Sequence, residues 1–184
     1  MQEVVRFQAV HTSDDMGYVY LWTGTGGGKT TNALGLALRN IGHRQKVIII
    51  QFMKWWKNTG EYKFMKMMPK YYEIYQFGRK GWIGLENLTE EDRKLAKKGL
   101  KFAEKCLKKR PSLLVLDEIN LAVYCKLLDS KDVIRFLNKI PKKTNVVLTG
   151  RYAPKELMNR ADFVNEVKDI KYPKKIPSTK GIQY

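Results

Sequence analysis

The nine residues TGTGGGKTT, from Thr23 to Thr31, decide how the rest of this 184-residue chain is interpreted. Glycines let the backbone curl until successive amides point inward at phosphate oxygens. Lys29 carries a charge that reaches phosphate, and the Thr30 hydroxyl is a ligand that Mg²⁺ accepts. The strict phosphate-loop pattern, GxxxxGK[ST], has glycine where this chain has Thr23, so the match is close but irregular. The glycines of the stretch are Gly24, Gly26, Gly27 and Gly28.

The sequence on both sides of this loop favours a phosphate site over a flexible loop that only needs small residues. YVYLW, residues 18–22, is aromatic and β-branched, which is typical of a β-strand. TTNALGLALRNIG, residues 30–42, places apolar side chains at helical spacing and ends in glycine. A strand, a glycine loop and a helix in this order bring the positive end of the helix to the bound phosphate.

Strands and helices alternate along the rest of the chain. This alternation predicts the α/β class, a three-layer RecA-like P-loop fold with a mostly parallel sheet and helices on both faces. We expect one nucleotide-binding domain, residues 17–184, because residues 1–16 lie outside the alternation. A capping signal, Thr89 with Asp92, begins the longest predicted helix. The further expected strands are 46–52, 71–77, 112–120, 145–151 and 163–171; the expected helices are 61–68, 88–109, 154–161 and one that Asp129 begins.

Lysine and arginine number 35 against 18 aspartates and glutamates, which gives a net charge of +17. Either this surface attracts polyanions such as nucleic acid, nucleotide or anionic membrane, or it is a solvated surface with no specific partner. The longest apolar run, VIII at residues 47–50, is far below the roughly 20 residues of a membrane helix, and the N-terminus has no apolar signal core. We therefore expect a cytoplasmic protein. Cys106 and Cys125 have the spacing of neither a disulfide framework nor a zinc site.

Asp117 and Glu118 follow a hydrophobic strand, and ligands of parallel sheets bind beyond the carboxyl ends of the strands. A carboxylate there can hold the Mg²⁺ that bridges phosphates, whereas an exposed acid pair that caps the next helix is the alternative. Together with the glycine loop, these acids predict a nucleoside triphosphate with Mg²⁺ as the ligand. They do not fix the reaction, because the same cradle serves attack at the γ-phosphorus and departure of the whole triphosphate.

Several separated motifs resemble one family. TGTGGGKTTNALGLALRNIGH, residues 23–43, is similar to the loop and helix of the ATP:corrinoid adenosyltransferases of the cobalamin pathway, whose pattern is TGxGKGKTT followed by a helix that ends in GH. The resemblance spans most of residues 17–184 in the family's order, which is more specific than one glycine loop. Its other motifs are VIIIQFMK, the pair Gly60–Glu61, LLVLDEIN, VVLTGR and the closing KGIQY.

The resemblance implies that the 5′-deoxyadenosyl group of ATP is transferred to the cobalt of a reduced corrinoid, with release of triphosphate. By the same likeness the loop from Gly24 through Thr25 to Thr31 holds the triphosphate. Lys29 and Arg151 neutralise it, and Thr30 and Glu118 bind the metal, with Asp117 as a further metal ligand. A cobalt(I) nucleophile needs no general base, so the protein supplies position, charge neutralisation and exclusion of oxidants.

Two departures from the family concern the triphosphate and the corrinoid. The family usually has lysine where Gly27 stands, and its GFTW stretch corresponds here to GRKGW, residues 78–82. Trp82 either packs on the macrocycle and helps displace the lower cobalt ligand, or anchors a loop to the core. Residues 1–16 either cover the corrinoid site or form a tail. The resemblance also implies a homodimer, and we expect an electron-donor protein as a partner.

Other features leave two interpretations each. The guanidinium of Arg151 either lies over the phosphates or pairs with Glu156 or Asp162. Trp55 and Trp56 either form a stacking surface for single-stranded nucleic acid or a corrinoid, or one is buried and the other lies at a rim. The alternatives for the whole chain are therefore a nucleic-acid-binding P-loop ATPase and a small nucleotide kinase. The kinase requires an arginine-rich lid, which we do not identify in the sequence.

Overall fold

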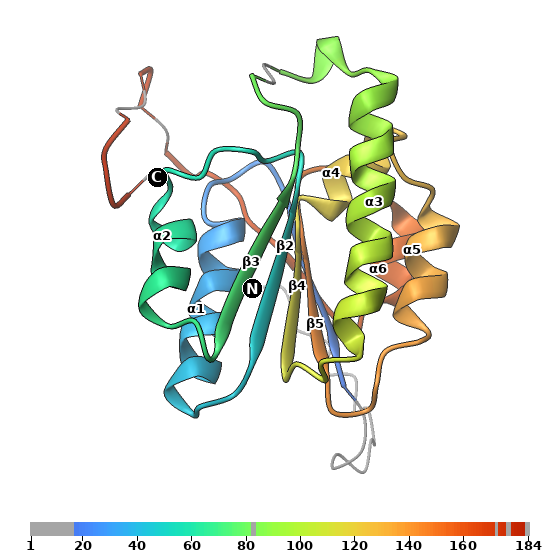
Figure 1. The fold of residues 1–184 in the computed structure, drawn as a ribbon. Coiled ribbons are helices and arrows are strands. Elements are labelled where there is room, and N and C mark those ends of the chain that lie inside the picture. The colour runs from blue at the N-terminus through green and yellow to red at the C-terminus, as the bar shows by residue number, and fades with distance from the viewer. Residues whose placement is uncertain (1–16, 82–83, 172, 176–177, 183–184) are drawn as a thin grey trace, which may run out of the picture.

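The computed structural model describes residues 17–81, 84–171, 173–175 and 178–182 (Figure 1). Its strands form one sheet in the order β3-β2-β4-β5-β1-β6, and each neighbouring pair is parallel. The strands are β1 (Val19–Thr23), β2 (Val47–Phe52), β3 (Tyr72–Phe77), β4 (Leu113–Asp117), β5 (Asn145–Thr149) and β6 (Phe163–Glu166). The helices are α1 (Lys29–Gly42), α2 (Gly60–Met67), α3 (Glu90–Leu107), α4 (Ile119–Tyr124), α5 (Ser130–Leu137) and α6 (Lys155–Arg160), with the short 3-10 helix η1 (Leu85–Asn87).

Helices cover both faces of the sheet, which confirms the predicted class (Figure 1). Strand β2 shows why a continuous apolar run was needed. Its Ile48 and Ile50 pack on the side of α3, whereas Val47 and Ile49 pack on the side of α1. A strand buried on both faces is apolar along most of its length, whereas a half-exposed strand alternates between apolar and polar residues. The sheet therefore separates two apolar layers, one under α1 and α2 and one under α3 to α6.

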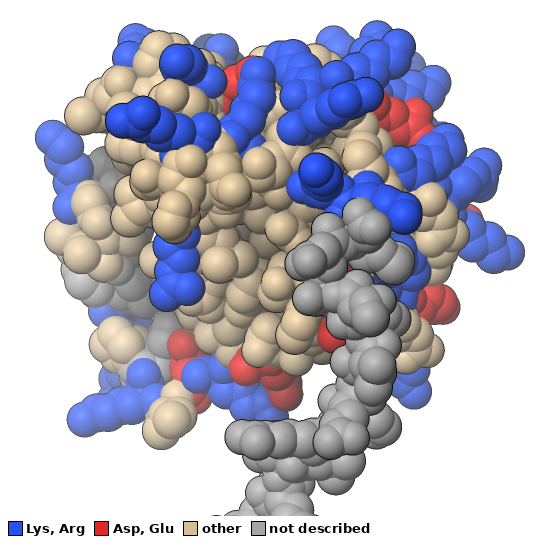
Figure 2. Space-filling view, turned by 90° about the horizontal axis from the view of Figure 1, so that it is seen from below, with Lys and Arg blue, Asp and Glu red and all other residues tan. Residues whose placement is uncertain are grey.

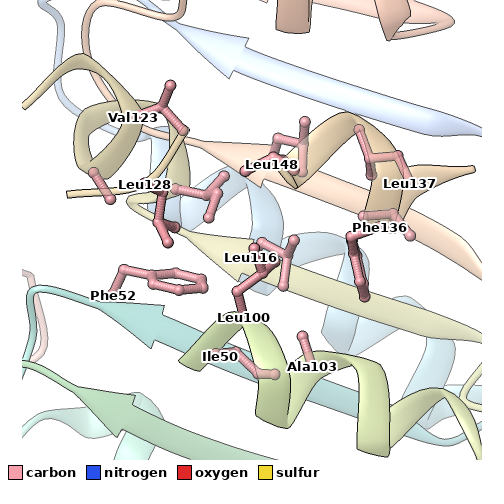
Figure 3. Packing of buried hydrophobic residues seen from close by; sticks show 14 of the residues in the cluster. Ile50, Phe52, Leu100, Ala103, Leu116, Val123, Leu128, Phe136, Leu137 and Leu148 are labelled. Atoms are coloured by element: carbon pink, nitrogen blue, oxygen red, sulfur yellow. The ribbon is translucent and has the colours of Figure 1, made fainter. Parts of the chain in front are cut away.

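The larger apolar layer joins the sheet to α3 and α5 (Figure 3). Phe52 and Leu116 from the strands lie opposite Leu100 of α3, and each of the three is buried. Gly99 lets α3 approach closely, because a β-carbon at this residue would lie 2.9 Å from the Phe52 ring. Full burial of a side chain of this size contributes roughly 1.5–3 kcal/mol to folding.

The predicted caps are present at two helices. Asp92 accepts hydrogen bonds from the backbone N–H of Thr89 at 2.8 Å and from its hydroxyl at 2.9 Å. Asp129 accepts one from the backbone N–H of Lys131 at 2.8 Å. These contacts satisfy amides that lack partners at a helix start.

The prediction that one strand runs over residues 112–120 is wrong at its end. Strand β4 stops at Asp117, and Ile119–Tyr124 is the helix α4, which the sequence did not predict. Glu118 makes the change of direction, with a φ of 63° in the left-handed region. The strands predicted over 145–151 and 163–171 likewise end earlier, at Thr149 and Glu166. Each correction shortens a strand at its carboxyl end, where the loops of the site begin.

One face of the molecule shows how basic side chains are distributed on it. Figure 2 shows Lys and Arg around the rim of one face, with uncharged residues at its centre and few Asp or Glu. None of the helices among the described residues has the length and apolar character that a membrane crossing requires. Cys106 and Cys125 are both free thiols.

Candidate nucleotide-binding site

The glycine loop lies between β1 and α1, and its shape depends on glycine at defined places. Gly24 has a φ of 99°, and a β-carbon there would lie 2.3 Å from the carbonyl oxygen of Val167. Gly28 has the same φ and is the residue that precedes α1. Among the described residues, no atom outside the loop's own neighbouring residues lies within 4 Å of a β-carbon added at Gly27 or Gly28, so this side of the loop faces open space. The positive end of α1 is thus open to an anion.

Lys29 is the first residue of α1 and is 7% exposed. Its ammonium donates a hydrogen bond to the carbonyl oxygen of Gly26, inside the loop. Burial lowers the pKa of Lys29, and nearby Arg151 lowers it further, while Glu118 and Asp169 oppose them. A bound phosphate group would place a negative charge next to this ammonium and favour its charged form.

Asp117, at the end of β4, is fully buried and joins four elements of the site. Burial alone would raise its pKa, but Lys54 and the hydroxyl donors lower it below the ordinary value, so the carboxylate is charged. Each of its two carboxylate oxygens accepts two hydrogen bonds. The donors are the Thr30 hydroxyl at 2.9 Å and the Thr149 hydroxyl at 2.7 Å to Oδ1, with Gln51 Nε2 at 3.0 Å and Lys54 Nζ at 2.7 Å to Oδ2.

Glu118 stands at the turn between β4 and α4, where its backbone N–H donates to the Thr149 hydroxyl at 3.0 Å. Its Oε2 atom is buried and accepts no hydrogen bond within the described part of the chain. Burial raises the pKa of Glu118 and Asp117 adds to this, while Lys54, Lys29 and Arg151 act in the opposite direction. An orphaned carboxylate oxygen and the Thr30 hydroxyl, both from residues that line one cavity, supply the kind of oxygen donors that Mg²⁺ prefers. These residues therefore fit a magnesium ion.

A cavity of about 330 Å³ brings these groups together, within the range of known ligand pockets. Asp117 lies beneath its floor, and Gly24 and Thr25 belong to the loop without lining it. The alternative interpretation, an exposed acid pair, is therefore wrong, because Asp117 is buried and Glu118 is half-buried. The lining residues are Gly26, Gly27, Gly28, Lys29, Thr30, Thr31, Met53, Lys54, Glu118, Leu121 and Arg151.

Arg151 reaches this cavity from the end of β5. The chain turns at Gly150, whose φ is 133° and whose added β-carbon would lie 2.9 Å from the backbone nitrogen of Leu121. Among the described ion pairs none joins Arg151 to Glu156 or Asp162. Asp162 instead accepts a hydrogen bond from the backbone N–H of Val19 at 2.7 Å. The exposed guanidinium of Arg151 is thus available to a ligand.

The segment after β6 crosses the glycine loop. Gly26 donates a backbone hydrogen bond to the carbonyl oxygen of Val167 at 2.9 Å. Gly27 donates one to the carboxylate of Asp169 at 3.2 Å. A carboxylate oxygen from the protein itself therefore lies on an amide of the kind that phosphate loops offer to phosphate.

Some residues of the site were not predicted, and others lie elsewhere. The roles of Lys54, Gln51 and Asp169 were not predicted. A lysine directly after a buried strand was the available signal for Lys54, because β2 ends at the same edge as the glycine loop. Trp55 is partly buried and Trp56 is 42% exposed, so the interpretation of one buried tryptophan is wrong. Trp82 and residues 1–16 lie outside the described residues.

A larger cavity of about 950 Å³ lies on another side of α4. Tyr124 and Tyr152 line it, with their rings 4.6 Å apart. Its lining includes no residue of the glycine loop, nor Glu118 or Arg151. Of these two cavities, the smaller is the candidate nucleotide site, because it combines loop amides, cations and a carboxylate.

Comparison with known proteins points to one enzyme family. Residues 15–184 match the family model described as ATP:corrinoid adenosyltransferase BtuR/CobO/CobP. A corrinoid adenosyltransferase of Sinorhizobium sp is 33% identical over 177 residues, which cover 94% of this chain and 82% of that protein. The enzymes of the same name from Pseudomonas aeruginosa and Escherichia coli K12 are 30% and 29% identical. Those matches cover 98% and 94% of this chain, and 90% and 87% of the respective relatives.

Proposed function

The chain belongs to the ATP:corrinoid adenosyltransferase family, and we propose that its glycine-loop cavity holds ATP while the 5′-deoxyadenosyl group passes to the cobalt of a reduced corrinoid. The observation that carries this proposal is the cavity itself. It unites Lys29, Arg151, the loop residues and Glu118 around one open space. A match over residues 15–184 means that the family likeness includes every part of this cavity.

The reaction places its main demand on the leaving group. Cobalt(I) attacks C5′ of ATP with its electron pair, the new bond is cobalt–carbon, and the C5′–O bond breaks. The bonding electrons depart with the triphosphate, and cobalt is formally oxidised from I to III. Lys29, Arg151 and the amides after Gly26 stabilise the charge that appears on the triphosphate. No proton leaves the nucleophile, so no side chain is needed as a general base.

We assign the magnesium ion to the Thr30 hydroxyl and the Glu118 carboxylate. The buried, unpartnered Oε2 of Glu118 supports this assignment. When bound there, the ion neutralises part of the triphosphate charge. Asp117 holds the Thr30 hydroxyl in place through the 2.9 Å hydrogen bond. In this assignment Glu118 contacts the magnesium ion, and Asp117 positions the side chains that contact the ion and the nucleotide.

The corrinoid side of the reaction is proposed from the sequence. We propose Trp82 as the aromatic contact of the macrocycle and residues 1–16 as a cover that closes over it in a homodimer. Arg79, in the same GRKGW stretch, donates from Nε to Asp92 at 3.2 Å, which anchors the start of this stretch to α3. A cobalt(I) substrate persists only under reducing conditions, so we also propose a cytoplasmic location and an electron-donor protein, in keeping with the two free thiols.

An anaerobic assay tests the function. The protein is mixed with Mg-ATP and chemically reduced cobalamin, the visible spectrum is followed for the cobalt–carbon product, and the released phosphate species are separated. We expect adenosylcobalamin and triphosphate in equal amounts, with neither formed when the corrinoid is omitted. Orthophosphate without corrinoid would instead support a P-loop ATPase, and ADP with a phosphorylated nucleotide would support a kinase.

A further inference from the structure

Lys54 enters the nucleotide cavity from the end of β2, and the surrounding backbone fixes its approach. Met53, directly before it, has a φ of 57° and donates a backbone hydrogen bond to the carbonyl oxygen of Phe77 at 3.1 Å. Gly78 lies so close that a β-carbon there would be 2.5 Å from the backbone nitrogen of Lys54. Such a left-handed turn at a residue with a side chain is uncommon and needs support from its surroundings. The support here turns Lys54 from the sheet into the cavity.

The ammonium of Lys54 contacts the Thr30 hydroxyl, one of the two proposed metal ligands, and the Asp117 carboxylate that holds this hydroxyl in place. Its Nζ atom lies 2.7 Å from Oδ2 of Asp117 and 3.2 Å from the Thr30 hydroxyl. Its partner Asp117 is fully buried, so the two groups form a close ion pair inside the site. A positive charge therefore already lies against the Thr30 hydroxyl. It is the charge that balances buried Asp117 in the free protein.

We propose that the Lys54 ammonium occupies the cation position of the site when no nucleotide is bound and leaves it when magnesium arrives with ATP. This inference rests on the proposed function only in naming Mg-ATP as the ligand. Magnesium binds oxygen at about 2.0–2.1 Å. An ion bound to the Thr30 hydroxyl would thus lie beside an ammonium that already contacts this hydroxyl. Two positive charges so close repel each other strongly in a partly buried site.

This arrangement makes metal binding depend on the nucleotide. Without ATP, a divalent ion would have to displace Lys54 and leave its charge with no new partner. With ATP, the displaced ammonium finds the triphosphate within the same cavity, which Lys54 lines together with Lys29 and Arg151. Lys54 then becomes a third cation on the leaving group. It is therefore a binding residue that keeps the site closed to free metal ions.

The test measures metal binding without ATP or corrinoid, using Mn²⁺ followed by electron paramagnetic resonance. We expect the wild-type protein to bind Mn²⁺ weakly and Lys54→Met to bind it at least tenfold more tightly. Lys54→Arg, which keeps the charge, should resemble the wild type. Adding Thr30→Ala to Lys54→Met should remove the gain, because it deletes a proposed ligand. Lys57→Met is the matched control, since Lys57 is an exposed lysine of the same loop.

Equal Mn²⁺ affinity in Lys54→Met and the wild type would overturn the inference, as would an equal gain in Lys57→Met. If Lys54→Met does not fold, Lys54→Gln serves the same test, because its amide can still donate to Asp117 without a charge. The readout requires no turnover. If adenosyl transfer fails but the Mn²⁺ pattern is as expected, the proposed function is refuted and the role of Lys54 stands. If adenosyl transfer occurs but Lys54→Met binds Mn²⁺ no more tightly than the wild type, the role of Lys54 is refuted and the proposed function stands.

Discussion

The carboxylate of Asp169 accepts a hydrogen bond from the backbone N–H of Gly27 at 3.2 Å, so the chain's own C-terminal segment engages the phosphate loop. This residue is exposed, and its negative charge also acts on Lys29. A triphosphate in the loop would compete with Asp169 for the amide and would be repelled by its charge. The contact is thus a modest barrier to the binding of ATP.

We expect Asp169→Asn to tighten ATP binding two- to fivefold, which corresponds to the roughly 0.5–1 kcal/mol of one exposed hydrogen bond. Isothermal titration calorimetry with Mg-ATP measures the change. Glu166→Gln is the control, because it removes the same charge from the same segment, and Glu166 pairs with Lys168 at 2.9 Å instead of with a loop amide. Equal affinities of the two variants would show that general charge, and not the Gly27 contact, sets the effect.

Substitution of Arg151 tests whether its guanidinium neutralises the charge of the leaving triphosphate. It lines the cavity and is exposed, and it takes part in none of the described ion pairs, so its removal should leave stability unchanged. We expect Arg151→Ala to lower kcat/KM for ATP about 100-fold, the typical loss of one donor aimed at developing charge. Arg151→Lys should recover part of this rate. Arg135→Ala, which breaks only the exposed pair with Asp132, should keep the wild-type rate.

Replacement of Glu118 by glutamine should weaken metal binding and raise the stability of the folded protein. Glu118→Gln keeps the shape but removes the charge, so we expect the Mg²⁺ concentration at half-maximal activity to rise about tenfold. A titration of adenosyl transfer against Mg²⁺ at saturating ATP gives this value. An unchanged Mg²⁺ requirement would exclude Glu118 as a ligand and return the role to Asp117.

The same variant predicts a dependence of stability on pH. Because burial raises the pKa of Glu118, the folded protein binds this proton more tightly than the unfolded chain does. Wild-type stability therefore falls, relative to Glu118→Gln, as pH rises through the raised pKa. We expect equal unfolding free energies below the ordinary pKa of 4.5 and a more stable variant at neutral pH, measured by urea unfolding. A variant that is less stable at neutral pH would contradict this.

The sequence indicated the elements well where one local rule decided them. The run VIIIQF predicts a buried strand, and Thr89 with Asp92 predicts a helix start, because both depend on neighbouring residues only. The order of the strands in the sheet, in contrast, does not depend on neighbouring residues alone. Strand β4 lies between β2 and β5, and β1 lies between β5 and β6. Crossovers through helices allow several such orders, so the hydrophobic pattern alone did not specify this one.

The site was predictable in its motifs and not in its contacts. The glycine loop, Glu118 and Arg151 meet at one cavity because parallel strands end at one edge. Lys54 and Asp117 are separated by 63 residues, and no local pattern links them. Helix α4 was missed because INLAVY continues the apolar character of β4, and periodicity does not separate a short buried helix from a strand.

Glu73 provides a prediction about stability away from the nucleotide cavity. It lies on β3 and accepts hydrogen bonds from Lys109 and the Tyr75 hydroxyl, both at 2.6 Å, and it pairs with Lys46 at 2.8 Å. Burial would raise its pKa, but these three donors lower it to about 2, against an ordinary value of 4.5. The folded protein thus favours the ionised form of Glu73 over the protonated form more strongly than the unfolded chain does.

We expect Glu73→Gln to lower the free energy of unfolding by about 2 kcal/mol at pH 7, because the folded protein gains from this ionised group above its unfolded pKa. The difference should shrink as pH falls from 4.5 toward 2, since the wild type then takes up the proton as well. Urea unfolding at several pH values between about 3 and 7 measures it. Glu104→Gln is the control; its pair with Lys139 is 43% and 57% exposed, so the loss should stay within about 1 kcal/mol at any pH. A Glu73 effect that does not change with pH would mean that packing, and not charge, accounts for the loss.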